Sequence, residues 1–146
     1  MQVLDFTTGI DCGVRGNLKQ FSPTGFSPVA DQLSTWSIDS LAEISFRLPP
    51  LRHDLRISSL VAPFLVEEAW LTKQDCWVYL NGLFVYFSSI TEACEISFAV
   101  SREMISPRVN RLSFVMPNAT APKELNRGED IRKLGLAFTR VAAAQV

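Results

Sequence analysis

An aromatic stretch, CWVYLNGLFVYF at positions 76–87, holds the side chains best suited to contact a ligand. Rings of Trp and Tyr pack on apolar C–H surfaces, such as those of a sugar, while their polar atoms form hydrogen bonds. Period-two spacing places Trp77 with Tyr79 on one strand and Phe84 with Tyr86 on the next. These residues are therefore the first candidates for a carbohydrate-binding surface.

Two arrangements of this stretch are compatible with its pattern, because both of its faces are apolar. Packing of the four rings in the core is the favoured arrangement, since cross-strand aromatic pairs stabilise sheets. If Cys76, Val78 and Leu80 point inward instead, the rings face outward, and an exposed patch of that size indicates a binding surface. Asn81 is expected to serve the turn between the strands, and it is kept as a candidate ligand contact.

A second candidate group lies in the polar stretch PKELNRGEDIR. Asp130 and Arg132 are two residues apart, so in an extended segment their carboxylate and guanidinium point the same way. Such a pair either pins the loop across the end of the fold, which is the favoured interpretation, or offers donors and acceptors to sugar hydroxyls. Lys123 and Glu124 are further candidate ligand contacts, although a solvated loop face is the more ordinary explanation.

No pattern in the sequence indicates catalysis. The chain lacks a GxSxG elbow, an HExxH pair, a P-loop and a glycine-rich dinucleotide fingerprint. Its paired acids, such as Glu67 and Glu68, are adjacent instead of spaced like the acid/base couple of a glycosidase. We therefore expect no enzyme activity, no catalytic residue, no metal site and no cofactor.

The cysteines and the single histidine also have ordinary explanations. Cys12, Cys76 and Cys94 are too few and too scattered for a disulfide framework or a metal clip, and we expect free thiols. His53 lies between Arg52 and Asp54, as in a surface loop.

Composition limits the class of partner. The 146-residue chain has 47% hydrophobic residues, which is enough for a globular core. Its net charge of −1, without a basic stripe, argues against nucleic acid. It has no apolar run long enough for membrane insertion and no visible signal peptide. A cytoplasmic location is expected, or a periplasmic one if the chain is part of a larger membrane protein.

Apolar residues recur with period two far more often than with the helical period. Strands are indicated by LAEISFRL, DLRISSLV, the two arms around Asn81-Gly82, EISFAV, NRLSFVMP and LGLAF. Asn-Gly is the preferred dipeptide of a type I′ hairpin turn. FLVEEAWLT and SREMIS are long enough for only one or two helical turns. Because parallel sheets need crossover helices, the strands must pair antiparallel in two packed layers.

The chain is expected to form one domain over residues 1–146. Residues 1–35 are rich in Gly, Ser and Pro and indicate loops around short edge strands, while residues 36–141 form the sandwich core. Pro117 and Pro122 exclude a continuous helix. The segment after Pro117 is therefore a polar loop with at most one turn, followed by a last strand containing Leu134, Leu136 and Phe138.

The closing motif P-K-E-L-x-x-x-x-D-x-R-K-L-G-L-x-F, residues 122–138, resembles the tail of a β-sandwich domain found in bacteria. The similarity covers roughly Trp36 to Val141 and includes ISFRLP and VYLNG. That domain is usually appended to membrane phosphoglycerol-transferase-like proteins and some glycosyltransferases of surface-polysaccharide systems. The resemblance implies a jelly-roll, galactose-binding-like fold that contacts carbohydrate and is not catalytic.

Two hypotheses about function follow. The first is a non-catalytic carbohydrate-binding or accessory module of a bacterial surface-polysaccharide system, with an oligosaccharide or polysaccharide as ligand and a glycosyltransferase-type protein as partner. The alternative is a structural, protein-docking or dimerisation module without sugar affinity.

Overall fold

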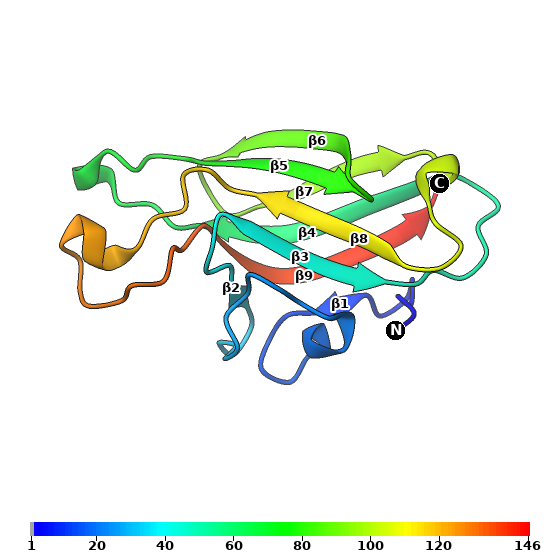
Figure 1. The fold of residues 1–146 in the computed structure, drawn as a ribbon, viewed down its shortest axis with the longest axis horizontal. Helices are drawn as coiled ribbons and strands as arrows, with labels where there is room; N and C mark the ends of the chain where they lie inside the picture. The colour runs from blue at the N-terminus through cyan, green and yellow to red at the C-terminus, as the bar shows by residue number, and fades with distance from the viewer. Residues whose placement is uncertain (1) are drawn as a thin grey trace.

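The structure, a computed structural model, describes residues 2–146 as nine β-strands and four 3₁₀ helices of about one turn each (Figure 1). The strands are β1 (Ile10–Asp11), β2 (Thr35–Trp36), β3 (Leu41–Phe46), β4 (Leu55–Pro63), β5 (Gln74–Leu80), β6 (Leu83–Ile90), β7 (Cys94–Val100), β8 (Asn110–Val115) and β9 (Leu136–Gln145). The helices are η1 (Leu18–Phe21), η2 (Glu67–Ala69), η3 (Arg102–Met104) and η4 (Pro122–Leu125).

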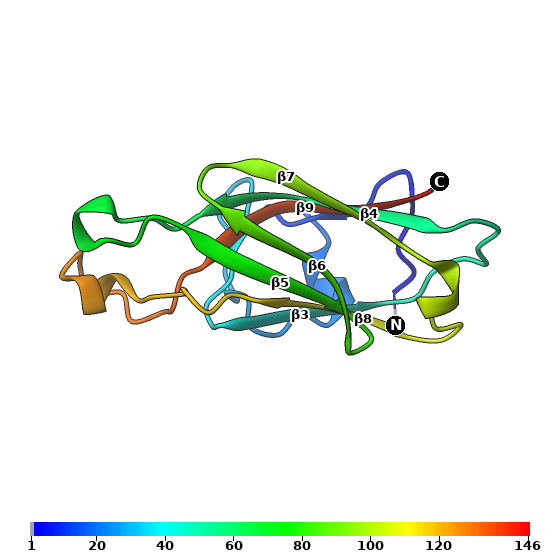
Figure 2. The ribbon, with the colours of Figure 1, turned by 90° about the horizontal axis from the view of Figure 1, so that it is seen from above.

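The strands form two antiparallel sheets packed face to face (Figure 2). One sheet has the order β1-β9-β4-β7, with β2 also paired to β9, and the other has the order β3-β8-β5-β6. From β2 to β9 the chain changes sheet at every connection except the β5–β6 hairpin. This alternation is that of a jelly roll. The predicted all-β, two-sheet sandwich is confirmed.

Alternating burial explains the strands. In β3, Ala42, Ile44 and Phe46 are buried, while the residues between them are partly exposed. The inner faces of the two sheets meet in a single core of aliphatic and phenylalanine side chains. Phe114 of β8 packs edge-on against Phe138 of β9, with ring centroids 4.8 Å apart, and so joins one sheet to the other.

The turns follow the sequence closely. Asn81 and Gly82 have φ of 52° and 84°, as both central residues of a type I′ turn require. The short turns predicted in FLVEEAWLT and SREMIS are η2 and η3, and the single turn predicted after Pro117, in KELNR, is η4, which begins one residue earlier, at Pro122. Within residues 2–146, no helix has the length and apolar character needed to cross a membrane.

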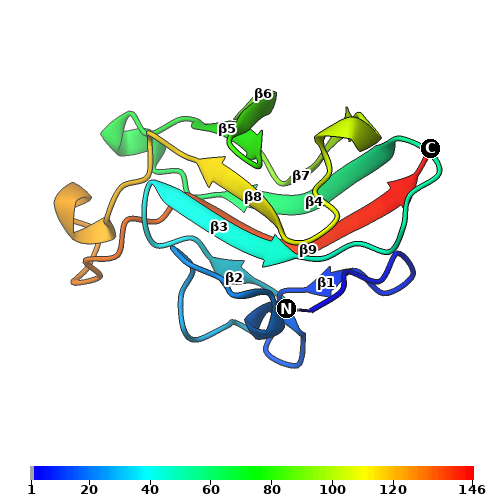
Figure 3. The same ribbon diagram turned by 45° about the vertical axis from the view of Figure 1, so that its right-hand side comes forward.

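The N-terminal segment closes one long edge of the sandwich (Figure 3). β1 and β2 pair with β9 of one sheet, while Thr24 bridges Glu43 of the other. Gly25 is needed there, because its φ is 75° and a Cβ would lie 1.9 Å from the Leu41 carbonyl oxygen. The buried Phe21 belongs to the same core as the strands, so this loop-rich segment is an integral part of the packing.

The last strand differs in detail from its predicted pattern. Leu134 precedes β9 and forms an isolated bridge with Thr120. In β9, Thr139 is an extra residue in the pairing with β4. After the buried Phe138, the next inward-facing residue is therefore Val141, three positions later instead of two. A simple period of two fails at this bulge, because one extra residue reverses the facing of every later side chain.

Candidate functional site

The β5 arm of the hairpin settles which face of the aromatic stretch is exposed. Cys76, Val78 and Leu80 are fully buried, and they form the inward set of β5. Trp77 is therefore 40% exposed, and Tyr79 is half-buried on the same outer face. Packing of these rings in the core, the favoured expectation, is wrong. The inner positions are already filled by the smaller residues.

The β6 arm contains a bulge that changes which of its rings face outward. Trp77 pairs with Phe87 and Tyr79 with Phe84, which leaves Val85 as the extra residue. Because of this insertion, Phe84 and Phe87 both lie on the outer face although they are three residues apart. Phe87 was not among the predicted site residues, and a strict period of two would assign it to the opposite face.

Tyr86, in contrast, lies on the inner side of the hairpin. Its ring stacks on that of Phe98 in β7, with centroids 5.3 Å apart and planes 19° apart, and it packs against the core. The expectation that Tyr86 shares a face with Phe84 is wrong, because the bulge at Val85 separates them. Tyr86 thus joins the two sheets along the edge opposite the N-terminal segment.

The exposed rings form one continuous cluster, which we call the aromatic face: Trp77, Tyr79, Phe84 and Phe87. Ring centroids are 4.4 Å apart for Trp77–Phe87, 5.8 Å for Trp77–Phe84 and 5.9 Å for Tyr79–Phe84. Neighbouring planes are tilted by 50° to 66°, so the face is a ridge of rings instead of a flat plane. Phe84 is the most exposed, at 54%.

Polar groups flank the aromatic face on the same side of the sheet. At one end, the Ser89 hydroxyl donates to Asp75 Oδ1 at 2.7 Å, and Lys73 Nζ lies 3.3 Å from Asp75 Oδ2. Beside Tyr79, the Ser113 hydroxyl donates to Glu43 Oε2 at 2.6 Å. These groups surround an apolar surface with hydrogen-bond donors and acceptors.

Asn81 holds the hairpin turn against the loop before β8. Its Nδ2 donates to the Met104 carbonyl oxygen and to Asn110 Oδ1, both at 3.0 Å. Its Oδ1 accepts a hydrogen bond of 2.8 Å from the Arg111 N–H. The carboxamide is thus occupied by the protein itself, while the turn borders a shallow hollow lined by Arg111, Ser113 and Glu43.

The charged loop is pinned through Asp130 and Arg132. Arg132 Nη2 lies 2.7 Å from Asp130 Oδ2, and Arg132 Nε lies 3.0 Å from Oδ1. Side-chain hydrogen bonds from Arg132, with its backbone N–H, lower the pKa of Asp130 from 3.8 to about 2. Arg132 Nη1 also donates to Ser27 Oγ at 3.3 Å. These contacts tie the loop to the N-terminal segment.

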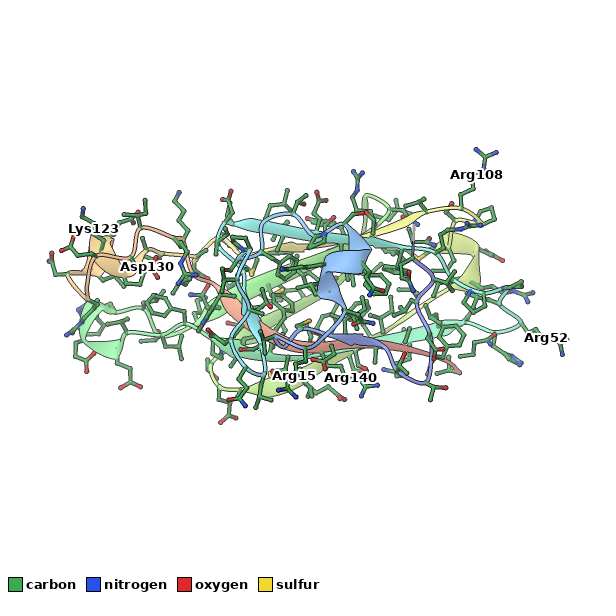
Figure 4. The ribbon with its side chains drawn as sticks, turned by 90° about the horizontal axis from the view of Figure 1, so that it is seen from below. Arg15, Arg52, Arg108, Lys123, Asp130 and Arg140 are labelled. Carbon is green, nitrogen blue, oxygen red and sulfur yellow. The ribbon has the colours of Figure 1, made fainter. Side chains whose placement is uncertain are left out.

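The structure does not join this loop to the aromatic face. Ser27 belongs to the segment that covers the β3 edge of the sheet, whereas the aromatic rings lie on β5 and β6. Lys123 and Glu124 are exposed at the loop's tip, with Lys123 Nζ 3.6 Å from Glu129 Oε2. Figure 4 shows Lys123 and Asp130 together at one end of the molecule. The predicted residues therefore belong to two separate surfaces.

The thiols are not activated as nucleophiles. Burial raises the pKa of Cys12 and of Cys76 to about 12, and the pKa of the exposed Cys94 is also raised. His53 lies on an exposed loop, as predicted. Within the described part of the chain, no three His, Cys, Asp or Glu residues are grouped so that they could hold a metal ion.

Comparison with known proteins finds a likeness in structure alone. No family model matches the chain, and no curated protein matches it. Among solved structures, a family 35 carbohydrate binding module from an environmental isolate is similar, with a TM-score of 0.44 and 8% sequence identity. The match covers 92% of this chain and 80% of that one.

Proposed function

We propose that this sandwich binds carbohydrate on its aromatic face and performs no catalysis. The observation that carries the proposal is the exposure of Trp77 and Phe84 side by side on the outer face of the sheet. Apolar ring surface in contact with water is unfavourable, and a partner that covers it gains about 25 cal/mol per Å². The C–H face of a pyranose is a suitable partner for such rings.

The polar border supports a sugar over a wholly apolar ligand. A sugar presents hydroxyl groups around its ring, and these need donors and acceptors when water is removed. The Asp75 and Glu43 carboxylates provide acceptors beside the rings, and the exposed Lys73 ammonium, with three hydrogens, provides donors. The pinned Asp130–Arg132 loop is not part of the proposed surface.

We further propose that the domain, residues 1–146, acts as an accessory module of a bacterial surface-polysaccharide system. This part rests on the likeness of the motif at residues 122–138 to domains appended to polymer-synthesising enzymes. A glycosyltransferase-type protein is then the expected protein partner. Genes for glycosyltransferases or polymer exporters beside this gene would support the assignment, and their consistent absence among its relatives would contradict it.

Calorimetric titration against a broad panel of polysaccharides tests the binding. The double variant Trp77→Ala, Phe84→Ala should weaken binding about tenfold or more, because each aromatic contact contributes about 0.5–1.5 kcal/mol beyond its buried area. Trp70→Ala is the matched control, since Trp70 is 90% exposed but lies within the β4–β5 connection, just after η2, and not in the hairpin. Thermal unfolding of each variant shows that it is folded.

Two results would contradict the proposal. One is folded wild-type protein that binds no polysaccharide of the panel. The other is equal loss of binding in the Trp70 control and in the double variant.

A second function, docking of a protein, is favoured by the position of β6. This strand is the outermost of its sheet and pairs only with β5 among the described strands, while Leu83 and Phe84 are each 54% exposed. A second copy of the chain could extend the sheet at this edge. Light scattering during size exclusion separates the functions: a stable dimer that Phe84→Ser converts to monomer favours docking.

A further inference from the structure

One end of the sandwich gathers five arginines, most of whose side chains make no contact that holds the described fold. It is made by residues 47–54, between β3 and β4, and residues 101–111, between β7 and the start of β8. Its charged residues are Arg47, Arg52, Asp54, Arg102, Glu103, Arg108 and Arg111. Five arginines against two acids leave a local excess of three positive charges in a chain whose net charge is −1. We call this region the arginine end (Figure 4, at Arg52 and Arg108).

These guanidinium groups lack carboxylate partners. Within residues 2–146, the four ion pairs all lie in residues 68–75 and 123–132. Of the five arginines, Arg102 alone makes a side-chain hydrogen bond in the described chain, from Nη1 to the Arg52 carbonyl oxygen at 3.0 Å. Asp54 accepts from the Arg102 backbone N–H, not from a guanidinium. Four fork-shaped donors are therefore free to bind an anion.

The arginine end also contains a groove with apolar walls. It has a volume of about 570 Å³, within the range of small-ligand sites. Two arginines, Arg47 and Arg102, and one acid, Glu103, line it together with Ser106, which leaves one excess positive charge. The remaining lining residues are proline or aliphatic: Leu48, Pro49, Pro50, Leu51, Ile105 and Pro107. Prolines keep these walls stiff, because their φ is fixed. The groove thus combines positive charge with a preformed apolar surface.

Strand pairing relates the aromatic face to the arginine end along the outer face of one sheet. Tyr79 pairs with Ser113, and Ser113 pairs with Glu43, which forms one row across the sheet. Two residues along the strands, on the same face, Arg111 pairs with Ser45. The hollow beside Asn81 connects the two rows, and Arg47 follows directly after β3. A chain-like ligand on the rings therefore reaches Arg111 and then Arg47.

We propose that the ligand of the aromatic face is an anionic polysaccharide whose negative groups lie against Arg111 and Arg47. This inference rests on the proposed function and names its ligand class. Arginine binds planar carboxylates and tetrahedral sulfate or phosphate groups by the same paired hydrogen bonds, so the shared feature is the anion. Neutral glycans contact the rings without using the arginines.

Titration with a matched pair of polymers tests this ligand class. The acidic polymer is polygalacturonate, and the neutral polymer is its carboxyl-reduced form, which keeps the chain but removes the charge. Dextran sulfate, which carries sulfate but no carboxylate, tests whether sulfate replaces carboxylate, and inorganic polyphosphate tests an anion without sugar. The wild type should bind the acidic glycans at least about tenfold more tightly than the neutral polymer, as hydrogen bonds to charged groups imply. The difference should shrink as salt rises.

The double variant Arg47→Gln, Arg111→Gln should lose this preference while it still binds the neutral polymer. Arg15→Gln is the matched control, because Arg15 is exposed and unpaired in the described chain but belongs to the N-terminal segment. Trp77→Ala should weaken binding of both polymers. The inference is overturned if the wild type binds acidic and neutral polymers with equal affinity, or if Arg15→Gln and the double variant weaken binding equally. In either case, weaker binding by Trp77→Ala still supports the proposed function.

Polyphosphate separates a further case. Suppose that polyphosphate binds as tightly as the acidic glycans and that Trp77→Ala weakens the binding of neither polyphosphate nor the glycans. This result overturns both the inference and the proposed function. Weak or absent polyphosphate binding, together with a Trp77 effect, supports both.

Discussion

The two ends of the sandwich use charge in opposite ways. At the end formed by η2 and η4, basic side chains pair with carboxylates, as in Arg127 with Glu68 and Arg132 with Asp130. At the arginine end, no guanidinium has a carboxylate within 4.0 Å in the described chain. Both ends consist of loops between strands of the two sheets (Figure 1). Loop structure by itself therefore does not require ion pairs.

Hydrogen bonds without ion pairs hold the arginine end, and a buried carboxamide makes several of them. Asn110 is fully buried, and its Oδ1 accepts from the Ser106 N–H at 2.7 Å and from Asn81 Nδ2 at 3.0 Å. Its Nδ2 donates to the Ser106 carbonyl oxygen at 3.1 Å. One buried carboxamide thus organises both the loop before β8 and the hairpin turn. The difference between the ends teaches that four of these arginines, Arg47, Arg52, Arg108 and Arg111, are available for a ligand, because no side-chain contact in the described chain holds their guanidinium groups.

The largest effect is expected for Asn110→Ala. This change leaves the part-buried Ser106 N–H and carbonyl oxygen without their side-chain partner, while Asn81 Nδ2 keeps the Met104 carbonyl oxygen. It should lower the free energy of unfolding by about 2–4 kcal/mol, since each unsatisfied polar group removed from water costs about 1–3 kcal/mol. Urea denaturation measures it. Gln20→Ala is the control, because Gln20 is exposed and makes no side-chain hydrogen bond in the described chain. A loss no larger than that of the control would contradict the assigned role of Asn110.

A smaller, pH-dependent effect on stability is expected for Asp130→Asn, at the end formed by η2 and η4. The pKa of Asp130 is lowered from 3.8 to about 2, so its ionised form is favoured in the folded state. Its contribution to stability is therefore present above pH 3.8 and is lost as the pH falls toward 2.

Denaturation curves at several pH values check this. The variant should be less stable than the wild type above pH 3.8, and the two should converge near pH 2. Glu124→Gln, at an exposed carboxylate without an ion pair in the described chain, is the control. A stability difference between Asp130→Asn and the wild type that stays constant down to pH 2 would contradict the role of the ion pair.

Arg127→Gln should change stability only slightly. Its guanidinium lies 3.5 Å from Glu68 Oε2, and both side chains are largely exposed. Exposed pairs contribute about 0.2–1 kcal/mol, and the lower part of that range is expected here. Thermal unfolding at low and high salt measures the change, which should diminish at high salt. A loss above about 2 kcal/mol would mean that the ion pair, instead of backbone contacts, holds the two loops together.

The smallest effect is expected for the double variant Arg47→Gln, Arg108→Gln. Neither side chain has a partner in the described chain, and removing like charges from one region relieves repulsion. Stability should stay within about 0.5 kcal/mol of the wild type. A clear destabilisation would show that these arginines serve the fold, and the contrast between the two ends would be lost.

Most of the fold could be predicted from the sequence because its strands are half-buried. LAEISF alternates in burial as the pattern indicates, and Asn81-Gly82 marks the hairpin by backbone chemistry alone. The pair of Asp130 and Arg132 was also predicted, since spacing within one extended segment is a local property.

The facing of the aromatic rings could not be predicted. Both faces of the hairpin are apolar, and the Val85 bulge has no glycine or proline to mark it. Phe87 was therefore missed and Tyr86 was placed on the wrong face. The arginine end was missed for another reason: Arg47 and Arg102 are far apart in sequence, and only the jelly-roll connections bring their loops to one end.

The unpaired Val85 has a consequence for how such a surface diversifies. Deleting this one residue would restore strict alternation and leave Phe84 opposite Tyr79 and Phe87 opposite Trp77, so both rings would still face outward. What the extra residue adds is local strand twist, which changes how the neighbouring rings tilt against each other. Lineages can therefore reshape the ridge through a single codon gained or lost, without exchanging any of its aromatic residues.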